Sequence, residues 1–511
     1  MIEEPKIGKN LIEILTDGMY KNPLFMYREY IQNSADAIDE AVNKKLLQNT
    51  REGVIKITIG PGVSIIIQDN GTGIKKSKVL KSLGDIADSE KDRKKSKGFR
   101  GIGRLGGVAY AKTLQFITSA KGEASKSIVT IDCMNLRNEI ADDKIKDNAS
   151  KIFAKNTTFS SEKEQKDKRY FIVHLESVSE KSLLDAEKVK TYLSTVSPVP
   201  YPAGFHFKKR IREYLRKNNV EFPEYEVFVN DNQIFKPYSS NFYSPKGSSQ
   251  KITDTVSTIK FEKIYRNNDL IAIMWYSISK LKNKLPLSSN PLAGIRYRQW
   301  NIQIGDENNI KHLFKEERGT MFFIGEVICA STDLIANSRR DSFNHNDTFS
   351  YLKESINSIA KELTKLYRKA NEISNVIKSR TNLEDAIEVY NNAAKKGFKN
   401  DGEANKAKRQ LEAKNNLVDI SLQKLERIKE DDSDQNQIIK SLYQEKIDDF
   451  SINNIEKTRK SIIPNKQISI TTSAKGINLD AVLSKIKQIL HNNMQKTRAD
   501  EIFEQIRDEL S

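Results

Sequence analysis

The sequence predicts an α/β protein with three parts: a mixed α/β region at residues 1–200, a second α/β region at 201–345 and a helical region at 346–511. Apolar β-branched runs alternate with helical periodicity as far as about residue 345, and SPVPYP (197–202) interrupts them. Beyond residue 346 long amphipathic stripes dominate. A chain of 511 residues also needs more than one core, because single cores stop growing at about 250–300 residues.

The composition is that of a soluble protein with ordinary cores and a large solvated surface. Hydrophobic residues make up 37% of the chain and charged residues 30%. No apolar stretch approaches the roughly 20 residues of a membrane span, and MIEEPKIGKN is acidic where a signal peptide would be basic. We therefore expect a cytoplasmic protein without a membrane contact. Cys133 and Cys329 lie far apart in apolar runs and are expected to be buried free thiols.

The first region begins with helical periodicity over residues 11–42, broken at Asn22–Pro23, so two helices are expected. Two β-branched runs at 54–60 and 63–70 then have the signature of a hairpin. The remaining predictions are a Lys-rich helix, a glycine-rich loop, strands at 114–120, 127–133 and 170–178, and a helix near 183–195. Residues 135–168 are polar and irregular and are expected to form an insertion.

The second region mixes a basic helix with four strand-like runs at 224–230, 270–281, 294–305 and 321–331. The tail is predicted to be a coiled-coil-like helical hairpin with a last helix over 479–509. Such a tail would suit a homodimer.

A polar helix face carries the first candidate site. Glu29, Asn33 and Asp36 are spaced four and three apart in MYREYIQNSADAID, which places them on one side of the predicted helix. That face could line a binding site, although an isolated polar face of this kind is usually solvated surface.

Two glycine-containing segments follow. In DNGTG (69–73) a carboxylate leaves the end of an apolar strand, followed by two glycines that let the backbone pass close to a ligand. GFRGIG (98–103) could offer backbone N–H groups to phosphates. Each segment alone is weak evidence, but their order and spacing behind the polar helix are specific.

This arrangement resembles the GHKL superfamily of ATPases, which includes gyrases, heat-shock chaperones, histidine kinases and MutL proteins and has a Bergerat-type sandwich fold. Residues 11–41 and LGDIADS (83–89) resemble the heat-shock protein 90 family. FRGIGRLGGVAY (99–110), GIRYRQWNIQIGDE (294–307) and IGEVICASTDLIANSRRDSF (324–343) are most similar to bacterial heat-shock-90-like or microrchidia-like ATPases.

The resemblance implies an ATP site with Mg²⁺. Glu29 would be the general base, Asn33 a ligand of Mg²⁺, and Asp69 the acceptor for the adenine amino group. Asp36 would support the helix and the pocket. The other implied ATP contacts are the turn glycines Gly71 and Gly73 and the lid residues Gly98, Arg100, Gly101, Ile102 and Gly103.

DLIANSRRD resembles the catalytic loop of the chaperones, which places Arg340 where an arginine contacts the γ-phosphate, with Arg339 as the neighbouring candidate. A surface pair between Arg340 and Asp341 is the alternative. The chaperones have Gly-Thr before the strand at 170–178, where this chain has Lys168–Arg169, and Thr157–Thr158 lie earlier. The threonine that would contact adenine is therefore unassigned.

These features favour an ATP-hydrolysing conformational clamp, used in antiphage defence with a partner protein or in DNA handling. A protein-remodelling chaperone, a non-hydrolysing scaffold and a kinase with His491 as acceptor are the alternatives. The net charge of +17 allows a nucleic-acid partner, and basic residues gather at 91–97 and 208–217. Solvated surface explains the same clusters.

Overall fold

The computed structural model describes residues 8–16, 22–60, 62–84, 97, 103–245, 247, 249–281, 283–431, 433–463 and 479–510. The chain forms two compact units, residues 1–371 and 372–511. The first contains all of the described strands, and the second is helical where it is described, so the predicted α/β class with a helical C-terminal region is confirmed. No helix in these ranges combines the length and apolar character needed to cross a bilayer.

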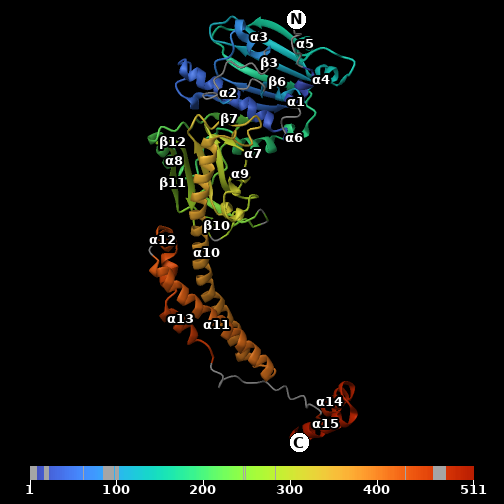
Figure 1. The fold of residues 1–511 in the computed structure, drawn as a ribbon, viewed down its shortest axis with the longest axis vertical. Helices are drawn as coiled ribbons and strands as arrows, with labels where there is room; N and C mark the ends of the chain where they lie inside the picture. Colours follow the sequence, from blue (N-terminus) through green and yellow to red (C-terminus); the bar gives the residue numbers. More distant parts are fainter. Residues whose placement is uncertain are drawn as a thin grey trace. The chain divides into compact units, whose positions relative to one another are not determined.

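The first sheet has eight strands in the order β5-β4-β3-β6-β2-β1-β7-β8. Figure 1 labels β3, β6 and β7 of this sheet. Its strands are β1 (Val54–Gly60), β2 (Ser64–Asp69), β3 (Thr113–Ser119), β4 (Ser125–Asp132), β5 (Thr157–Lys163), β6 (Tyr170–Glu176), β7 (Glu226–Val229) and β8 (Asn232–Gln233). The helices of this region are α1 (Asn10–Thr16), α2 (Phe25–Asn43), α3 (Lys76–Gly84), α4 (Cys133–Ala141), α5 (Ala149–Lys155), α6 (Lys181–Leu184) and α7 (Ala186–Val196), with 3₁₀ turns at η1 (Thr50–Glu52) and η2 (Gly103–Gly107).

The core of this region lies between α2 and the sheet. Alternate residues of β1 and β2 point to one face, and Ile57 and Ile67 pack there with Tyr27 and Ile31 of α2. The break at Asn22–Pro23, the helix that follows it and the antiparallel β1–β2 hairpin are confirmed.

Two expectations for the first sheet were wrong. The stretch 135–168 is not an irregular insertion, because it contains most of α4, all of α5 and the edge strand β5, whose side chains are mostly exposed and so lack an apolar alternation. The run at 224–230 was assigned to the second region, but β7 pairs in parallel with β1 and completes the first sheet. The chain thus returns to the first sheet after the predicted boundary at residue 200.

The second sheet has five strands in the order β11-β12-β15-β13-β14. Its strands are β11 (Thr258–Arg266), β12 (Asp269–Ile278), β13 (Gly294–Gln299), β14 (Ile302–Ile304) and β15 (Ile324–Cys329), and β9 (Asn241–Tyr243) pairs with β10 (Ile252–Thr255) separately. The helical segments are α8 (Lys208–Lys217), α9 (Asn308–Lys311) and η3 (Glu317–Phe322). The run at 294–305 is two strands, because Trp300 and Asn301 both have positive φ and form a two-residue hairpin turn.

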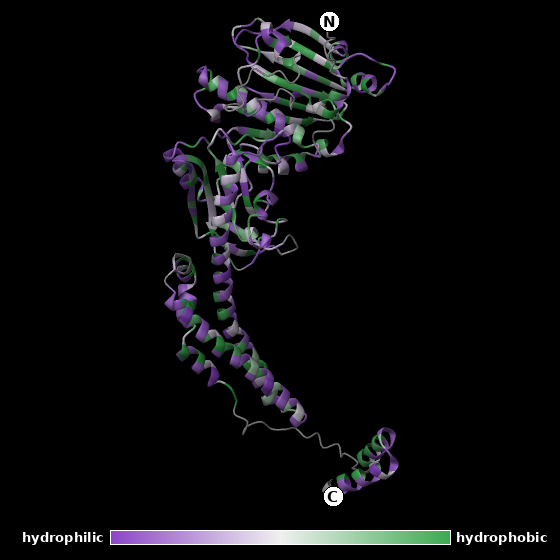
Figure 2. Ribbon diagram, in the orientation of Figure 1, coloured by the Kyte–Doolittle hydropathy of each residue, from purple (hydrophilic) through white to green (hydrophobic). Residues whose placement is uncertain are grey.

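The helices of the tail are α10 (Asp347–Lys396), α11 (Asp401–Glu430), α12 (Asp434–Asp449), α13 (Ile452–Arg459), α14 (Leu479–Asn493) and α15 (Lys496–Leu510). Hydrophilic and hydrophobic residues alternate along them (Figure 2). Buried Ile373, Val376, Leu383 and Ile387 follow the helical repeat of α10. The single last helix expected over 479–509 is instead a pair, and His491 of α14 contacts Asp500 of α15 at 2.6 Å.

Both cysteines are buried free thiols, as expected. Burial raises the pKa of the Cys133 thiol to about 12, which keeps it protonated and unreactive at neutral pH.

Candidate ATP site

The polar face of α2 forms one wall of the candidate site. Glu29 is buried, and Asn33 and Asp36 are half-buried, so this face is not solvated surface. One oxygen of Asp36 accepts a hydrogen bond from the backbone N–H of Lys97 at 2.9 Å. Asp36 therefore holds the backbone of Lys97 against α2.

Asp69 ends β2 beside this wall and is 2% exposed. Its Oδ1 accepts a hydrogen bond from the backbone N–H of Gly71 at 2.9 Å. The turn packs tightly on α2, since a Cβ built on Gly71 would lie 2.6 Å from the Cβ of Ala37. Asp69 and the polar face of α2 are thus brought together by direct backbone packing.

Gly73 has φ +62°, and a Cβ there would lie 1.8 Å from the backbone oxygen of Ser119. Both facts require glycine, because the turn rests on the end of β3. The next residue is held as well: the hydroxyl of Thr118 accepts from the N–H of Ile74 and donates to the oxygen of Tyr170, each at 2.9 Å. The two bonds of Thr118 and the close packing of Gly73 therefore hold this turn against the sheet.

Arg169, one of the two residues that stand where the chaperones have Gly-Thr, contacts the turn after Asp69, a role that the sequence did not indicate. Its Nη1 donates to the backbone oxygens of Asn70 and Gly71, and its Nη2 to that of Leu46 at 3.3 Å. Arg169 therefore braces the turn through its carbonyl groups. Thr157 and Thr158 lie on β5, which three strands separate from β2, so neither is near Asp69.

Of the expected lid residues, Gly98, Arg100, Gly101 and Ile102 lie outside the described residues. Gly103 begins η2 and packs on the catalytic candidate, since a Cβ built on it would lie 2.6 Å from Oε2 of Glu29. Tyr30 of α2 secures η2, because its hydroxyl accepts from the N–H of Gly107 at 3.0 Å and donates to the oxygen of Arg104 at 2.9 Å.

Arg340 reaches this site from the loop that follows β15. Its Nε lies 3.1 Å from Oε1 of Glu29, with the two side chains 5% and 8% exposed, and its Nη2 donates to the backbone oxygen of Lys97. Arg339 is exposed and contributes only its backbone oxygen, which accepts from Arg28 at 3.0 Å. The alternative surface pair with Asp341 does not describe this arrangement, because Arg340 is buried against Glu29, 311 residues away.

Lys97 is a second residue that the sequence did not single out. It was grouped with a basic run expected at the surface, yet it is 3% exposed and pairs with Asp39 of α2. Asp39 also accepts from the hydroxyl of Tyr225 at 2.5 Å, and burial and Asp39 raise the pKa of Tyr225 well above its usual value. One lysine among several in a polar run gives no sequence signal for such a contact.

These residues fit ATP and Mg²⁺ in two respects. Gly71, Gly73 and Gly103 pack so closely on Ala37, Ser119 and Glu29 that a side chain would collide at each position, so these segments lie against the residues of the candidate site as bare backbone. The donor set also suits the cation, because Mg²⁺ prefers oxygen ligands and is usually held by few protein groups together with phosphates and water. The half-buried amide of Asn33, one turn from Glu29, offers one such oxygen.

Comparison with known proteins agrees with this geometry. Residues 25–181 match the family model described as histidine kinase-, DNA gyrase B- and HSP90-like ATPase. The chaperone protein HtpG of Chlorobium phaeobacteroides is 33% identical over 87 residues, which cover 16% of this chain and 14% of that protein. HtpG of Ruthia magnifica is 30% identical over 156 residues, covering 24% and 25%.

A longer match, to HtpG of Buchnera aphidicola subsp. Cinara cedri, is 26% identical over 244 residues and covers 46% of this chain and 38% of the relative. The chain thus spans well under half the length of these three curated relatives. Residues 25–181, which match the family model, contain α2, the β1–β2 hairpin and the turn that follows Asp69. With the site geometry, this match identifies the N-terminal part of this chain as an ATPase domain of the GHKL, HSP90-like family.

Proposed function

We propose that this protein is an ATP-binding and ATP-hydrolysing conformational clamp. The observation that carries the proposal is the buried contact of Arg340 with Glu29, which joins the loop after β15 to the helix that forms the wall of the ATP site. The pair satisfies both buried charges, but its desolvation offsets much of the attraction, so a gain in stability is a weak explanation for it and a role in the ATP site is the one proposed.

In this proposal each residue of the site has one task. Glu29 orients the attacking water and accepts its proton, and Asn33 is the protein ligand of Mg²⁺. Asp69 accepts a hydrogen bond from the adenine amino group. When bound, Mg²⁺ neutralises phosphate charge, and the glycines of the turn and of η2 allow the backbone to approach the nucleotide.

Arg340 makes the site composite. In the structure its guanidinium pairs with Glu29; in the reaction it would turn to the transferred phosphate, where a permanently charged fork of donors stabilises the developing charge. Hydrolysis then requires the second sheet region to hold its loop against the first, which couples turnover to conformation. We propose that the molecule works as a homodimer.

Arg340→Ala is expected to lower the turnover number by at least about a hundredfold, while ATP affinity changes only a few-fold, since arginines in this role are worth about 10³–10⁵ in rate. Phosphate release and calorimetric titration with a non-hydrolysable ATP analogue measure the two quantities. Arg339→Ala is the matched control, because Arg339 is exposed. Equal turnover in both variants would remove Arg340 from the mechanism.

The relatives are named chaperones, so protein remodelling is one proposed output of the clamp. Antiphage defence with a partner protein is a separate proposed output that these names do not address. A scaffold that binds ATP without hydrolysing it is the alternative that the turnover measurement decides.

DNA handling is a second candidate because one basic surface combines cations with two half-buried aromatic rings. Tyr214 of α8 stacks on Phe261 of β11 with ring centroids 3.9 Å apart. Arg210 lies 5.7 Å from the centre of the Phe261 ring, and the ammonium of Lys263 lies 5.9 Å from that of Tyr214. Cations interleaved with rings suit a phosphate backbone.

If this surface binds DNA, the double variant Arg210→Glu, Lys263→Glu should weaken DNA binding at low salt by about tenfold or more, because two phosphate contacts are lost. The slope of the binding constant against salt should also become shallower. Fluorescence anisotropy with a labelled duplex over a salt series is the measurement. Lys144→Glu with Lys151→Glu makes the same change in net charge at exposed positions elsewhere. Equal weakening by both pairs, or no binding by the wild type at low salt, would reject the surface.

A further inference from the structure

The turn of the β13–β14 hairpin is fastened to the first sheet region, and the far end of the same hairpin holds the Arg340 loop. We propose that Arg298 is a positioning residue: it locks this hairpin against α7 and thereby holds Arg340 at the ATP site. The inference rests on the proposed function, because it concerns the delivery of Arg340.

All three nitrogens of the Arg298 guanidinium contact the joint between the β13–β14 hairpin and α7. Its Nε pairs with Glu326 of β15, its Nη1 donates to the backbone oxygen of Asn301 at 3.0 Å, and its Nη2 donates to the oxygen of Thr195 at 2.8 Å. Thr195 lies in the last turn of α7, in the first region. The side chain is fully buried, so one residue ties together a strand, a hairpin turn and a helix end.

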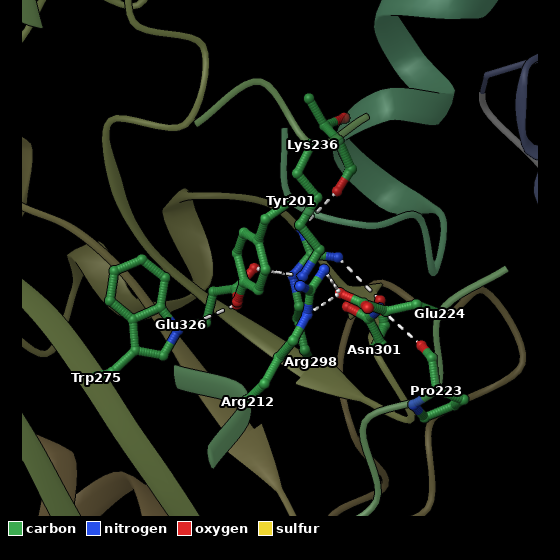
Figure 3. A network of polar contacts seen from close by, with 10 residues as sticks. Tyr201, Arg212, Pro223, Glu224, Lys236, Trp275, Arg298, Asn301 and Glu326 are labelled. Carbon is green, nitrogen blue, oxygen red and sulfur yellow. Dashed lines mark hydrogen bonds and ion pairs between the residues drawn. The ribbon is translucent and has the colours of Figure 1, made fainter. Parts of the chain in front are cut away.

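Glu326 holds Arg298 in this position (Figure 3). It is fully buried and also accepts from the Tyr201 hydroxyl at 2.5 Å and from Trp275 Nε1 at 3.1 Å, while Lys236 Nζ lies 3.2 Å away. Burial opposes its ionisation, but Arg298 and Lys236 together hold the pKa of Glu326 at about 2. The carboxylate therefore stays charged at neutral pH, and Arg298 has a fixed anchor.

Asn301 makes a separate bond across the same joint. Its φ is +65°, it is fully buried, and its Nδ2 donates to the backbone oxygen of Pro223 at 2.8 Å. Pro223 lies just before β7, which belongs to the first sheet, and the neighbouring Glu224 is paired with Arg212 at 2.9 Å (Figure 3). The turn of the hairpin is thus seated between α7 and the entry to β7.

The opposite end of the hairpin holds the Arg340 loop. The N–H of Gly305, directly after β14, donates to the backbone oxygen of Arg340 at 2.9 Å. At the turn end of the hairpin, Gln299 adds a second bond to the segment after β15, since its Nε2 donates to the oxygen of Leu334 at 2.6 Å. Since β14 has only three residues, a shift of the turn would be carried directly to Arg340.

A lysine cannot replace Arg298 in this joint. One ammonium can still pair with Glu326, but it cannot also reach the oxygens of Thr195 and Asn301 in the geometry of a guanidinium fork. Arg298→Lys therefore keeps the buried carboxylate paired while it releases the joint. Asn301→Gly releases the bond to Pro223 and leaves the charged cluster intact, and glycine accepts the positive φ.

Both variants, made in the full chain, are expected to lower the turnover number about tenfold while the dissociation constant for a non-hydrolysable ATP analogue stays within twofold. In an Arg340→Ala background they should change turnover by less than twofold, because they act through Arg340. Arg296→Lys is the matched control: Arg296 is also buried, two residues away, but it donates to Ala293 and Pro291 and pairs with Glu307 at 3.4 Å, all within the second region. Thermal unfolding of each variant identifies losses caused by misfolding.

Full additivity with Arg340→Ala, or turnover in both variants equal to that of Arg296→Lys, would overturn the positioning role while leaving the proposed function intact. If Arg340→Ala itself leaves turnover unchanged, the proposed role of Arg340 and this inference both fail.

Discussion

Glu29→Ala should hydrolyse ATP at least about a hundredfold more slowly than the wild type and still bind it, because loss of a general base typically costs 10²–10⁴ in rate. Glu29 is 7% exposed, pairs with Arg340 and packs on Gly103, so no neighbouring carboxylate of α2 stands in the same place. Glu29→Gln is the companion variant, since its amide oxygen can still accept from Arg340 while it cannot take a proton from water.

Single-turnover hydrolysis and calorimetric binding of ATP by the same preparations separate chemistry from affinity. Glu40→Ala is the control, because Glu40 lies on the same helix but is exposed, and its contacts are a weak surface pair with Lys44 and a long 3.4 Å bond from the Thr72 hydroxyl. Turnover of both Glu29 variants near that of Glu40→Ala would show that the base lies elsewhere.

Asp69→Asn is expected to lower the affinity for ATP by at least about a hundredfold, because a buried polar group that is left without its hydrogen-bond partner is costly. Oδ1 of Asp69 already accepts from the N–H of Gly71, so an asparagine that keeps this bond presents its NH₂ to the nucleotide. Two amino groups then face each other at the adenine ring. The same NH₂ could donate to the carbonyl of guanine, so the preference for ATP over GTP should also shrink.

Competitive titrations with labelled ATP against ATP and GTP measure both effects. Asp132→Asn is the matched control: Asp132 also ends a strand of the first sheet, where it caps α4 by accepting from the N–H of Asn135 at 2.9 Å. An Asp69→Asn protein that binds ATP within threefold of the wild type would exclude Asp69 as the adenine acceptor.

The parts of the site that could be predicted from the sequence are those built by local rules. Helical spacing places Glu29, Asn33 and Asp36 on one face, and a β-branched run delivers Asp69 to a strand end. Arg340 was singled out through a motif as a phosphate contact, and in the structure its side chain pairs with Glu29.

The parts that could not be predicted depend on contacts between distant segments. Lys97 pairs with Asp39 of α2, and its ammonium lies 5.8 Å from the ring centre of Tyr225, just before β7. The carbonyls braced by Arg169 lie about a hundred residues earlier in the chain. The edge strand β5 lacks the alternation that marks a half-buried strand, because its side chains face solvent. Neither composition nor periodicity carries such information.

The return of β7 and β8 to the first sheet decides how this molecule can be divided. A fragment that stops at residue 200 would leave β1 with unpaired backbone groups on one side, which is the kind of open edge that recruits other chains into aggregates. Such a fragment would also lose Tyr225, which holds Asp39. Any fusion, deletion or exchange between relatives should therefore keep residues 226–233 together with the first sheet, although residues 201–225 separate them from it in the sequence.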